Sequence, residues 1–123
     1  MIRAVLAAAL LPLAAAASDD PLAGRVAGPP ERCIPVSTTN GPNVIDARTI
    51  LYTRGTSGGI VYRSTIESCP ALRPLTTLIV DVYGGQVCRN DRFRVLEPGL
   101  SIPSAYCRFG DFVPYRKVKG RSD

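Results

Sequence analysis

Apolar and polar residues alternate along most of this chain, with a period of two. In the segment 44–54, the alternating positions are Ile50 and Tyr52 on one face and Thr49, Leu51 and Thr53 on the other. Similar patterns occupy 60–66, 76–83 and 86–96, and a last strand is expected at 105–115, with Gly110 as a bulge. Successive side chains of a strand point to opposite faces, so this period is typical of half-buried antiparallel strands. The sequence therefore predicts a small all-β domain of five or six strands, built as a curled sheet, an open barrel or a sandwich, with at most one short helical turn.

Glycine and proline separate the predicted strands. The segment 55–59, Gly-Thr-Ser-Gly-Gly, lies between two strand patterns, and its glycines supply the positive φ angles that a hairpin loop needs. A phosphate-binding loop would lead into a helix, and a nucleophile elbow would need a G-x-S-x-G spacing with a base, so a turn is the better interpretation. Gly84-Gly85 predicts a two-residue hairpin turn. The segment 69–75, which contains two prolines, leaves room only for the short helical turn.

The first residues have the pattern of a secretory signal peptide. Arg3 precedes a short apolar run, and small residues lead to Ala17, where we expect cleavage and hence a signal peptide at 1–17. A membrane anchor is the alternative, but the run is shorter than the roughly 20 apolar residues that a spanning helix needs. We therefore expect a periplasmic or secreted protein with no transmembrane segment.

The rest of the chain predicts a linker, one domain and a basic tail. Residues 18–32 are rich in Pro, Gly, Ala and charge, which indicates a flexible linker, and 33–115 should form a single β-rich domain. The tail 116–123 holds four basic residues and one acid, whereas 18–115 holds ten basic and nine acidic residues. The net charge of +5 is therefore largely a property of the tail, which we expect to be disordered and solvated rather than bound to a membrane.

The four cysteines predict two disulfides. Cys33, Cys69, Cys88 and Cys107 form an even set behind an export signal, and they lack the close C-x-x-C pairs of zinc sites. Three connectivities are open. A hairpin symmetric about Glu97-Pro98-Gly99 would place Cys88 opposite Cys107, so Cys88–Cys107 with Cys33–Cys69 is slightly favoured.

The chain contains no histidine, which removes most neutral-pH acid–base catalysis and most metal sites. A hydrolase would then need paired carboxylates with split pKa values, and Asp46 and Asp91 are the best candidates. The simpler interpretation is that each caps a turn or joins a cross-strand ion pair. No catalytic residue, cofactor or metal is therefore expected.

Four arginines lie on or near the last two predicted strands: Arg89, Arg92, Arg94 and Arg108. If those strands pair, these side chains could form a patch that contacts an anion or a partner. A solvated sheet face is the favoured explanation for them, given the usual polar-out pattern of a half-exposed sheet. Because 18–115 is almost neutral, nucleic-acid binding is not expected.

Several short motifs span about 32–115: Arg32-Cys33-Ile34, Asp46-x-Arg48-Thr49-Ile50-Leu51, Val61-Tyr62-Arg63, Cys69-Pro70-x-Leu72, Val87-Cys88-x-x-Asp91 and Cys107-x-x-Gly110-x-Phe112. As a set they resemble an uncharacterised family of small exported proteins of Gram-negative bacteria, a domain of unknown function. The resemblance implies a compact, cysteine-containing, β-rich periplasmic domain. It implies no activity, substrate or catalytic residue.

These observations favour a non-enzymatic binding or structural domain of the cell envelope, with another envelope protein as the expected kind of partner. A His-independent hydrolase using Asp46 and Asp91 is one alternative. A thiol-redox or metal-binding protein using the four cysteines is the other, although its C-x-x-C signature is missing.

Overall fold

The structure is a computed structural model that describes residues 20–56 and 59–118. The predicted signal peptide 1–17, two residues of the glycine loop and the end of the tail lie outside the described residues. The described residues form ten strands: β1 (Arg25–Ala27), β2 (Cys33–Pro35), β3 (Thr39–Asp46), β4 (Thr49–Arg54), β5 (Ile60–Thr65), β6 (Thr77–Val80), β7 (Gln86–Cys88), β8 (Arg92–Leu96), β9 (Cys107–Arg108) and β10 (Phe112–Lys117).

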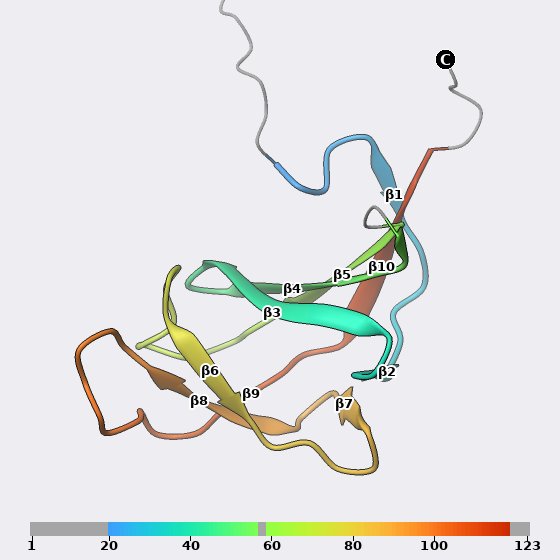
Figure 1. Cartoon of the computed structure of the whole chain (residues 1–123). Coiled ribbons are helices and arrows are strands. Elements are labelled where there is room, and N and C mark those ends of the chain that lie inside the picture. The colour runs from blue at the N-terminus through green and yellow to red at the C-terminus, as the bar shows by residue number, and fades with distance from the viewer. Residues whose placement is uncertain (1–19, 57–58, 119–123) are drawn as a thin grey trace, which may run out of the picture.

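All strand pairs are antiparallel, and they form three sheets (Figure 1). The largest sheet has the order β1-β10-β5-β4-β3, the second has the order β6-β8-β9, and β2 pairs with β7 in the smallest. No sheet closes into a barrel in the described part of the chain. The prediction of an all-β antiparallel domain is confirmed, with more and shorter strands than the period of two suggested.

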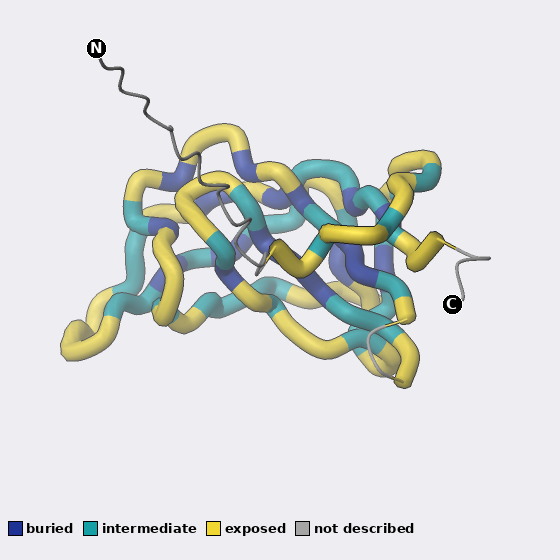
Figure 2. Tube along the Cα trace, turned by 90° about the horizontal axis from the view of Figure 1, so that it is seen from above, coloured by how far each residue is buried: buried dark blue, intermediate teal, exposed yellow. Residues whose placement is uncertain are grey.

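The three sheets share one hydrophobic core, and each contributes fully buried side chains. Tyr62 and Phe112 come from the five-stranded sheet, Phe93 from the three-stranded sheet, and Ile34 from the two-stranded sheet. Figure 2 shows buried positions through the middle of the molecule and exposed loops at its ends. The predicted alternation therefore holds for the core-facing residues, because the apolar face of each sheet points toward the same interior.

Phe109, which lies between β9 and β10, joins the sheets through aromatic contacts. Its ring centroid lies 4.6 Å from that of Phe93, 5.6 Å from that of Phe112 and 6.3 Å from that of Tyr52. The next residue, Gly110, passes so close to β5 that a Cβ there would collide with the carbonyl oxygen of Thr65. Glycine is thus required at the point where the chain crosses from one sheet to the other.

Several predicted strands are interrupted by tight turns. The segment 44–54 divides into β3 and β4, because the Asp46 carboxylate accepts a hydrogen bond from the Arg48 N–H (2.9 Å) and closes a turn. The segment 86–96 divides into β7 and β8 at Asn90, whose φ of 75° suits asparagine better than most residues. The alternating pattern in the sequence thus runs through both turns, so it does not show where one strand ends and the next begins.

The Gly84-Gly85 turn is confirmed, but the strands around it are not partners over their full length. Both glycines have positive φ, 66° and 77°, and the turn is closed by a bridge between Tyr83 and Gln86. Beyond the bridge the chain separates, because β6 pairs with β8 and β7 pairs with β2. Similarly, β4 and β5 form the hairpin expected around the 55–59 loop, with Arg54 opposite Ile60.

The predicted linker and tail both require correction. Within 18–32, β1 pairs with β10, and Glu31 forms a two-way backbone bridge with Phe112. Within 116–123, Arg116 and Lys117 belong to β10 and pair with β5 and β1. Polar composition suggested disorder, but strands at a sheet edge are stabilised by backbone hydrogen bonds that composition does not show.

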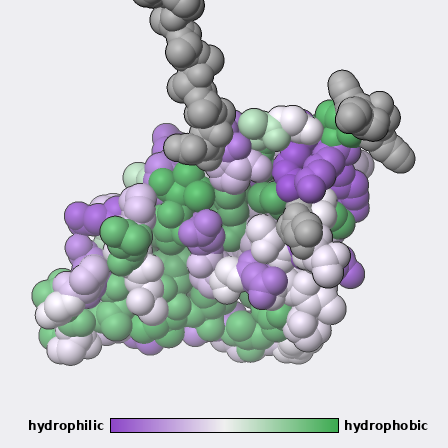
Figure 3. All heavy atoms as spheres, turned by 45° about the horizontal axis from the view of Figure 1, so that its top comes forward, coloured by the Kyte–Doolittle hydropathy of each residue, from purple (hydrophilic) through white to green (hydrophobic). Residues whose placement is uncertain are grey.

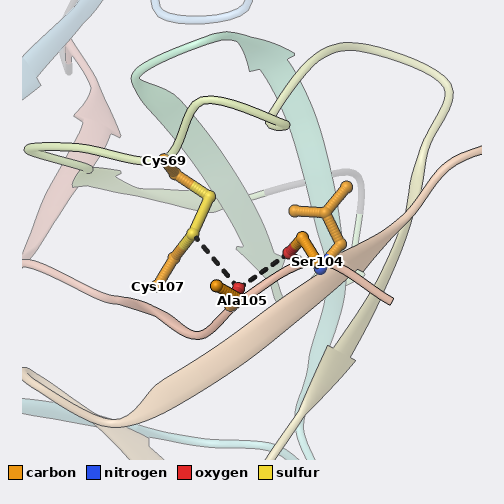
Figure 4. The surroundings of a disulfide bond; sticks show 5 residues. Cys69, Ser104, Ala105 and Cys107 are labelled. Atoms are coloured by element: carbon orange, nitrogen blue, oxygen red, sulfur yellow. Dashed lines mark hydrogen bonds between the residues drawn. A yellow bond between two sulfur atoms is a disulfide. The ribbon is translucent and has the colours of Figure 1, made fainter. Parts of the chain in front are cut away.

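Two disulfides are present, but their pairing differs from the favoured prediction. Cys33 bonds to Cys88 as a cross-strand partner in the β2–β7 sheet, and Cys69 bonds to Cys107 on β9. The symmetric hairpin about 97–99 does not form, because the β8–β9 register places Cys107 opposite Phe93 rather than opposite Cys88. Figure 4 shows that the second disulfide lies beside Ser104 and Ala105, where the chain returns toward β9.

Candidate functional site

The outer face of the three-stranded sheet carries three of the four predicted arginines. Arg92 and Arg94 are two residues apart on β8, so they share a face, and Arg92 lies directly opposite Arg108 on β9. The alternate residues of β8, Phe93 and Val95, are buried in the core. The alternation of β8 therefore places the arginines on the outer face of the sheet, while its inner face packs on the core.

Tyr106 is the organising residue of this face. The guanidinium carbon of Arg92 lies 4.3 Å from the centroid of the Tyr106 ring, and that of Arg94 lies 5.0 Å from it. Guanidinium groups stack favourably on tyrosine rings through cation–π attraction. One ring, itself 48% exposed, thus holds two like charges side by side. We call Arg92, Arg94, Tyr106 and Arg108 the basic face.

The charges of the basic face are only partly neutralised. Arg92 reaches Asp81 at 3.6 Å, but within the described residues no carboxylate lies within ion-pair distance of Arg94 or Arg108. Arg108 instead donates a hydrogen bond to the carbonyl oxygen of Asn90 (2.9 Å). The Nε of Arg94 is buried and has no hydrogen-bond partner among the described residues. Buried donors are normally paired, so this nitrogen is an exception to the usual pattern.

Arg89, the fourth predicted arginine, lies in a groove beside the basic face. Its guanidinium is 3.4 Å from Asp111, and both side chains line an open hollow of about 570 Å³. The hollow also reaches Tyr106 and Arg108, so it continues into the basic face. Its remaining lining residues are Thr65, Glu67, Ser68, Asn90, Cys107, Phe109 and Gly110. The groove contains both signs of charge, whereas the basic face carries the surplus of positive charge.

The segment that presents Tyr106 is fixed to β8. The Val95 N–H donates to Ser104 Oγ (2.9 Å), and the Ser104 N–H donates to the Val95 carbonyl (2.8 Å). Ser104 Oγ in turn donates to the carbonyl of Ala105 (2.7 Å), as Figure 4 shows. Three residues later, the Cys107 disulfide ties the same segment to the core. Tyr106 is therefore held between two attachment points rather than carried on a free loop.

Asp46 and Asp91 do not form a carboxylate pair in one cleft. Asp46 caps the β3–β4 turn, and Asp91 accepts a hydrogen bond from the Cys88 N–H (2.8 Å) in the turn between β7 and β8. Neither residue lines the groove beside the basic face. The structure thus gives both acids the turn-capping role that was the simpler prediction for them.

The cysteines of the described residues are paired with each other, and no cluster of metal-ligand side chains forms there. All four cysteines are bonded in the two disulfides, so the described part of the chain holds no free thiol. No group of three or more potential ligands gathers there to hold a metal ion. A helix long and apolar enough to span a bilayer is also missing from residues 20–56 and 59–118.

Sequence reasoning missed Tyr106. The signal was present, because Tyr106 stands two residues before Arg108 and therefore shares its face on a strand. What the sequence lacks is the register between β8 and β9, which places Tyr106 next to Arg94. The pairing of β8 with β9 is needed to show that the ring of Tyr106 contacts both Arg92 and Arg94.

The chain is thus an all-β domain with two disulfides, a combination typical of oxidising, extracytoplasmic environments. Comparison with known proteins adds no name to this class, since no family model, no curated protein and no solved structure matches the chain. The resemblance to a family of small exported domains stays a prediction. Any function must be inferred from the basic face and its groove.

Proposed function

We propose that this chain is a non-enzymatic binding domain of an oxidising, extracytoplasmic compartment, and that its basic face recognises oxyanionic groups of a ligand or partner. The observation that carries the proposal is the pair of guanidiniums, Arg92 and Arg94, on the ring of Tyr106. Arginine donors are arranged in a planar fork that matches carboxylate and phosphate oxygens.

The arrangement favours binding because its conformational cost is reduced before a ligand arrives. Free arginine side chains lose rotamer freedom when they are immobilised in an interface. Here the ring of Tyr106 restrains both side chains, and the Ser104 and Cys107 attachments restrain Tyr106. An oxyanion would also supply a counter-charge for Arg94 and Arg108, neither of which has a carboxylate partner among the described residues.

The alternatives have less support. A hydrolase based on Asp46 and Asp91 would need both carboxylates at one reaction centre, whereas each caps a different turn. A thiol-redox protein would typically carry an accessible C-x-x-C pair, whereas the four cysteines lack this spacing and Cys69 and Cys107 are buried.

The test is a titration of the purified domain with inorganic pyrophosphate, followed by ¹H–¹⁵N spectra of the arginine Nε–H groups. We expect shifts at Arg94 and Arg92, and a loss of affinity of about tenfold or more in Arg94→Gln, because a charge-assisted hydrogen bond is removed. Arg63→Gln is the matched control. Arg63 also stacks on a tyrosine, Tyr115, and also has a buried, unpartnered Nε, but it lies on the five-stranded sheet. No shift at millimolar pyrophosphate, or an equal loss in both variants, would contradict the proposal.

A further inference from the structure

Large aliphatic side chains project from one end of the three-stranded sheet. Leu75 is 91% exposed, Ile102 is 80% exposed and Leu100 is 57% exposed. They belong to two loops that meet beyond the last β6–β8 pair, Thr77 opposite Leu96. In Figure 1 the β8–β9 loop forms one end of the molecule, and Figure 3 shows hydrophobic surface at that end. We call Leu75, Leu100 and Ile102 the apolar tip.

The two loops of the apolar tip are held in place. An ion pair between Arg73 and Glu97 (3.2 Å) joins them, and the Leu100 N–H donates to the Glu97 carbonyl (3.0 Å) to close a turn. Leu75 has a φ of 71°, a left-handed conformation that leucine rarely adopts. Folding of the core does not use this side chain, since it is almost wholly exposed. Backbone strain of this kind is characteristic of positions selected for function rather than for stability.

The apolar tip continues the basic face along the same strand. Outward-facing residues of a strand are about 7 Å apart, so Arg92, Arg94 and Leu96 lead in steps from the arginines to the tip. The three-stranded sheet therefore carries guanidiniums on its outer face and exposed aliphatic side chains on the loops at one end. This order of charge and hydrophobicity matches a bilayer surface, where anionic headgroups lie beside acyl chains.

We propose that this side of the domain docks on an anionic lipid surface, with the apolar tip inserted between headgroups and the basic face on headgroup phosphates. The proposal rests on the proposed function, because it names the source of the oxyanions. The positive charge of the basic face complements anionic headgroups. The shape of the tip favours lipid over a protein partner, since separate aliphatic side chains on protruding loops suit insertion better than the flat, aromatic-rich centre of a protein interface.

The test is co-sedimentation of the exported protein with two kinds of vesicles, one of phosphatidylcholine alone and one of equal parts phosphatidylcholine and phosphatidylglycerol. We expect binding to the anionic vesicles only, weakened by salt. Arg92→Gln/Arg94→Gln and Leu75→Asn/Ile102→Ser should each lower the partition coefficient about tenfold or more. Asparagine at position 75 suits the left-handed conformation, so this variant should stay folded. Val26→Ser is the control, because Val26 is 59% exposed on β1, far from the tip.

The pyrophosphate titration separates the two proposals and also reports whether each variant is folded. If wild-type protein binds pyrophosphate but neither kind of vesicle, lipid docking is overturned and the oxyanion function stands. If it binds neither probe, both proposals fail. Vesicle binding that survives either double variant, or that Val26→Ser weakens equally, would also overturn lipid docking. Leu75→Asn/Ile102→Ser should bind pyrophosphate like wild type while losing the vesicles, a result that supports both proposals.

Discussion

The two faces of the three-stranded sheet use the same strands for different purposes. On the inner face of β8, Phe93 and Val95 are 0% and 1% exposed and belong to the core that all three sheets share. On the outer face, Arg92 and Arg94 contact a ring that is half exposed. Folding determines the inner residues closely, because close-packed interiors tolerate little change in volume. It places far weaker demands on the outer residues, so their arrangement is the better guide to function.

The outer face of the five-stranded sheet strengthens this distinction. It also carries an arginine on a tyrosine, Arg63 on Tyr115, at 5.2 Å. Around that pair, however, Leu51 and Val61 are only 2% and 4% exposed, so apolar packing continues on this face as well. Arg63 is therefore a single stacked cation beside buried apolar residues, whereas the basic face gathers three arginines, of which Arg92 and Arg94 are half-buried and Arg108 is exposed. The contrast makes Arg63 the natural control for Arg94.

The largest expected difference between the two faces is in stability. Phe93→Ala should lower the free energy of unfolding by about 4 kcal/mol, because it removes a fully buried ring that contacts Phe109. Arg94→Ala, one residue away on the outer face, should change it by only about 0.5 kcal/mol. Urea denaturation of both variants measures the two values directly.

If Phe93→Ala does not fold, Phe93→Leu provides the milder comparison, with an expected loss below about 1.5 kcal/mol. Equal losses at positions 93 and 94 would show that the outer face is part of the folding core. The claim that its residues are free to serve binding would then be wrong.

The inner face is also the part of the molecule that the sequence predicts best. A period of two, together with β-branched and aromatic residues, is sufficient to assign β-strands and to separate core residues such as Ile50 and Phe93 from their polar neighbours. This succeeds because burial imposes a repeating pattern on each strand. The same pattern cannot show where one strand ends and the next begins, so Asp46 and Asn90 concealed turns inside predicted strands.

The outer face and the disulfides were harder to predict because they depend on register. The sequence drew attention to Arg89, Arg92, Arg94 and Arg108, but it could not show that Tyr106 stands beside two of them. Cysteine spacing likewise suggested a symmetric hairpin, whereas a long loop displaces Cys107 to a position opposite Phe93. Contacts between residues far apart in the chain follow from strand pairing, which local periodicity does not encode.

The two disulfides should also differ in what they contribute to the basic face, with a somewhat smaller effect on stability than Phe93. Replacing either pair by alanine should cost about 3 kcal/mol, since each closes a long loop in the unfolded chain. Cys69 and Cys107 are 5% and 6% exposed within the core, and Cys107 is next to both Tyr106 and Arg108. Loss of this pair should therefore also weaken pyrophosphate binding, because β9 loses its attachment.

Loss of the Cys33–Cys88 pair should lower stability without weakening binding, because this disulfide lies in the β2–β7 sheet. Thermal unfolding and the pyrophosphate titration, carried out on both double variants, distinguish the two effects. Equal weakening of binding by both pairs would mean that the basic face depends on global stability and not on the position of β9.

The smallest effect concerns the inner side of the five-stranded sheet, and it appears only at alkaline pH. Burial raises the pKa of Tyr52 above its ordinary value, because desolvation penalises the phenolate. The unfolded chain releases this proton near the ordinary pKa of about 10, while the folded chain retains it. Stability should therefore be unaffected below about pH 10 and should fall above it, by up to about 1.4 kcal/mol per pH unit.

Tyr52→Phe should remove this part of the alkaline loss, because phenylalanine has no proton to release. Urea denaturation of wild type and variant at pH 9 and at higher pH, with brief exposure to protect the disulfides, tests the expectation. A Phe variant with the same alkaline loss would show that Tyr52 ionises normally in the fold. It would mean that water reaches the ring between Phe109 and Phe112, and that the inner faces are less completely sealed than their packing indicates.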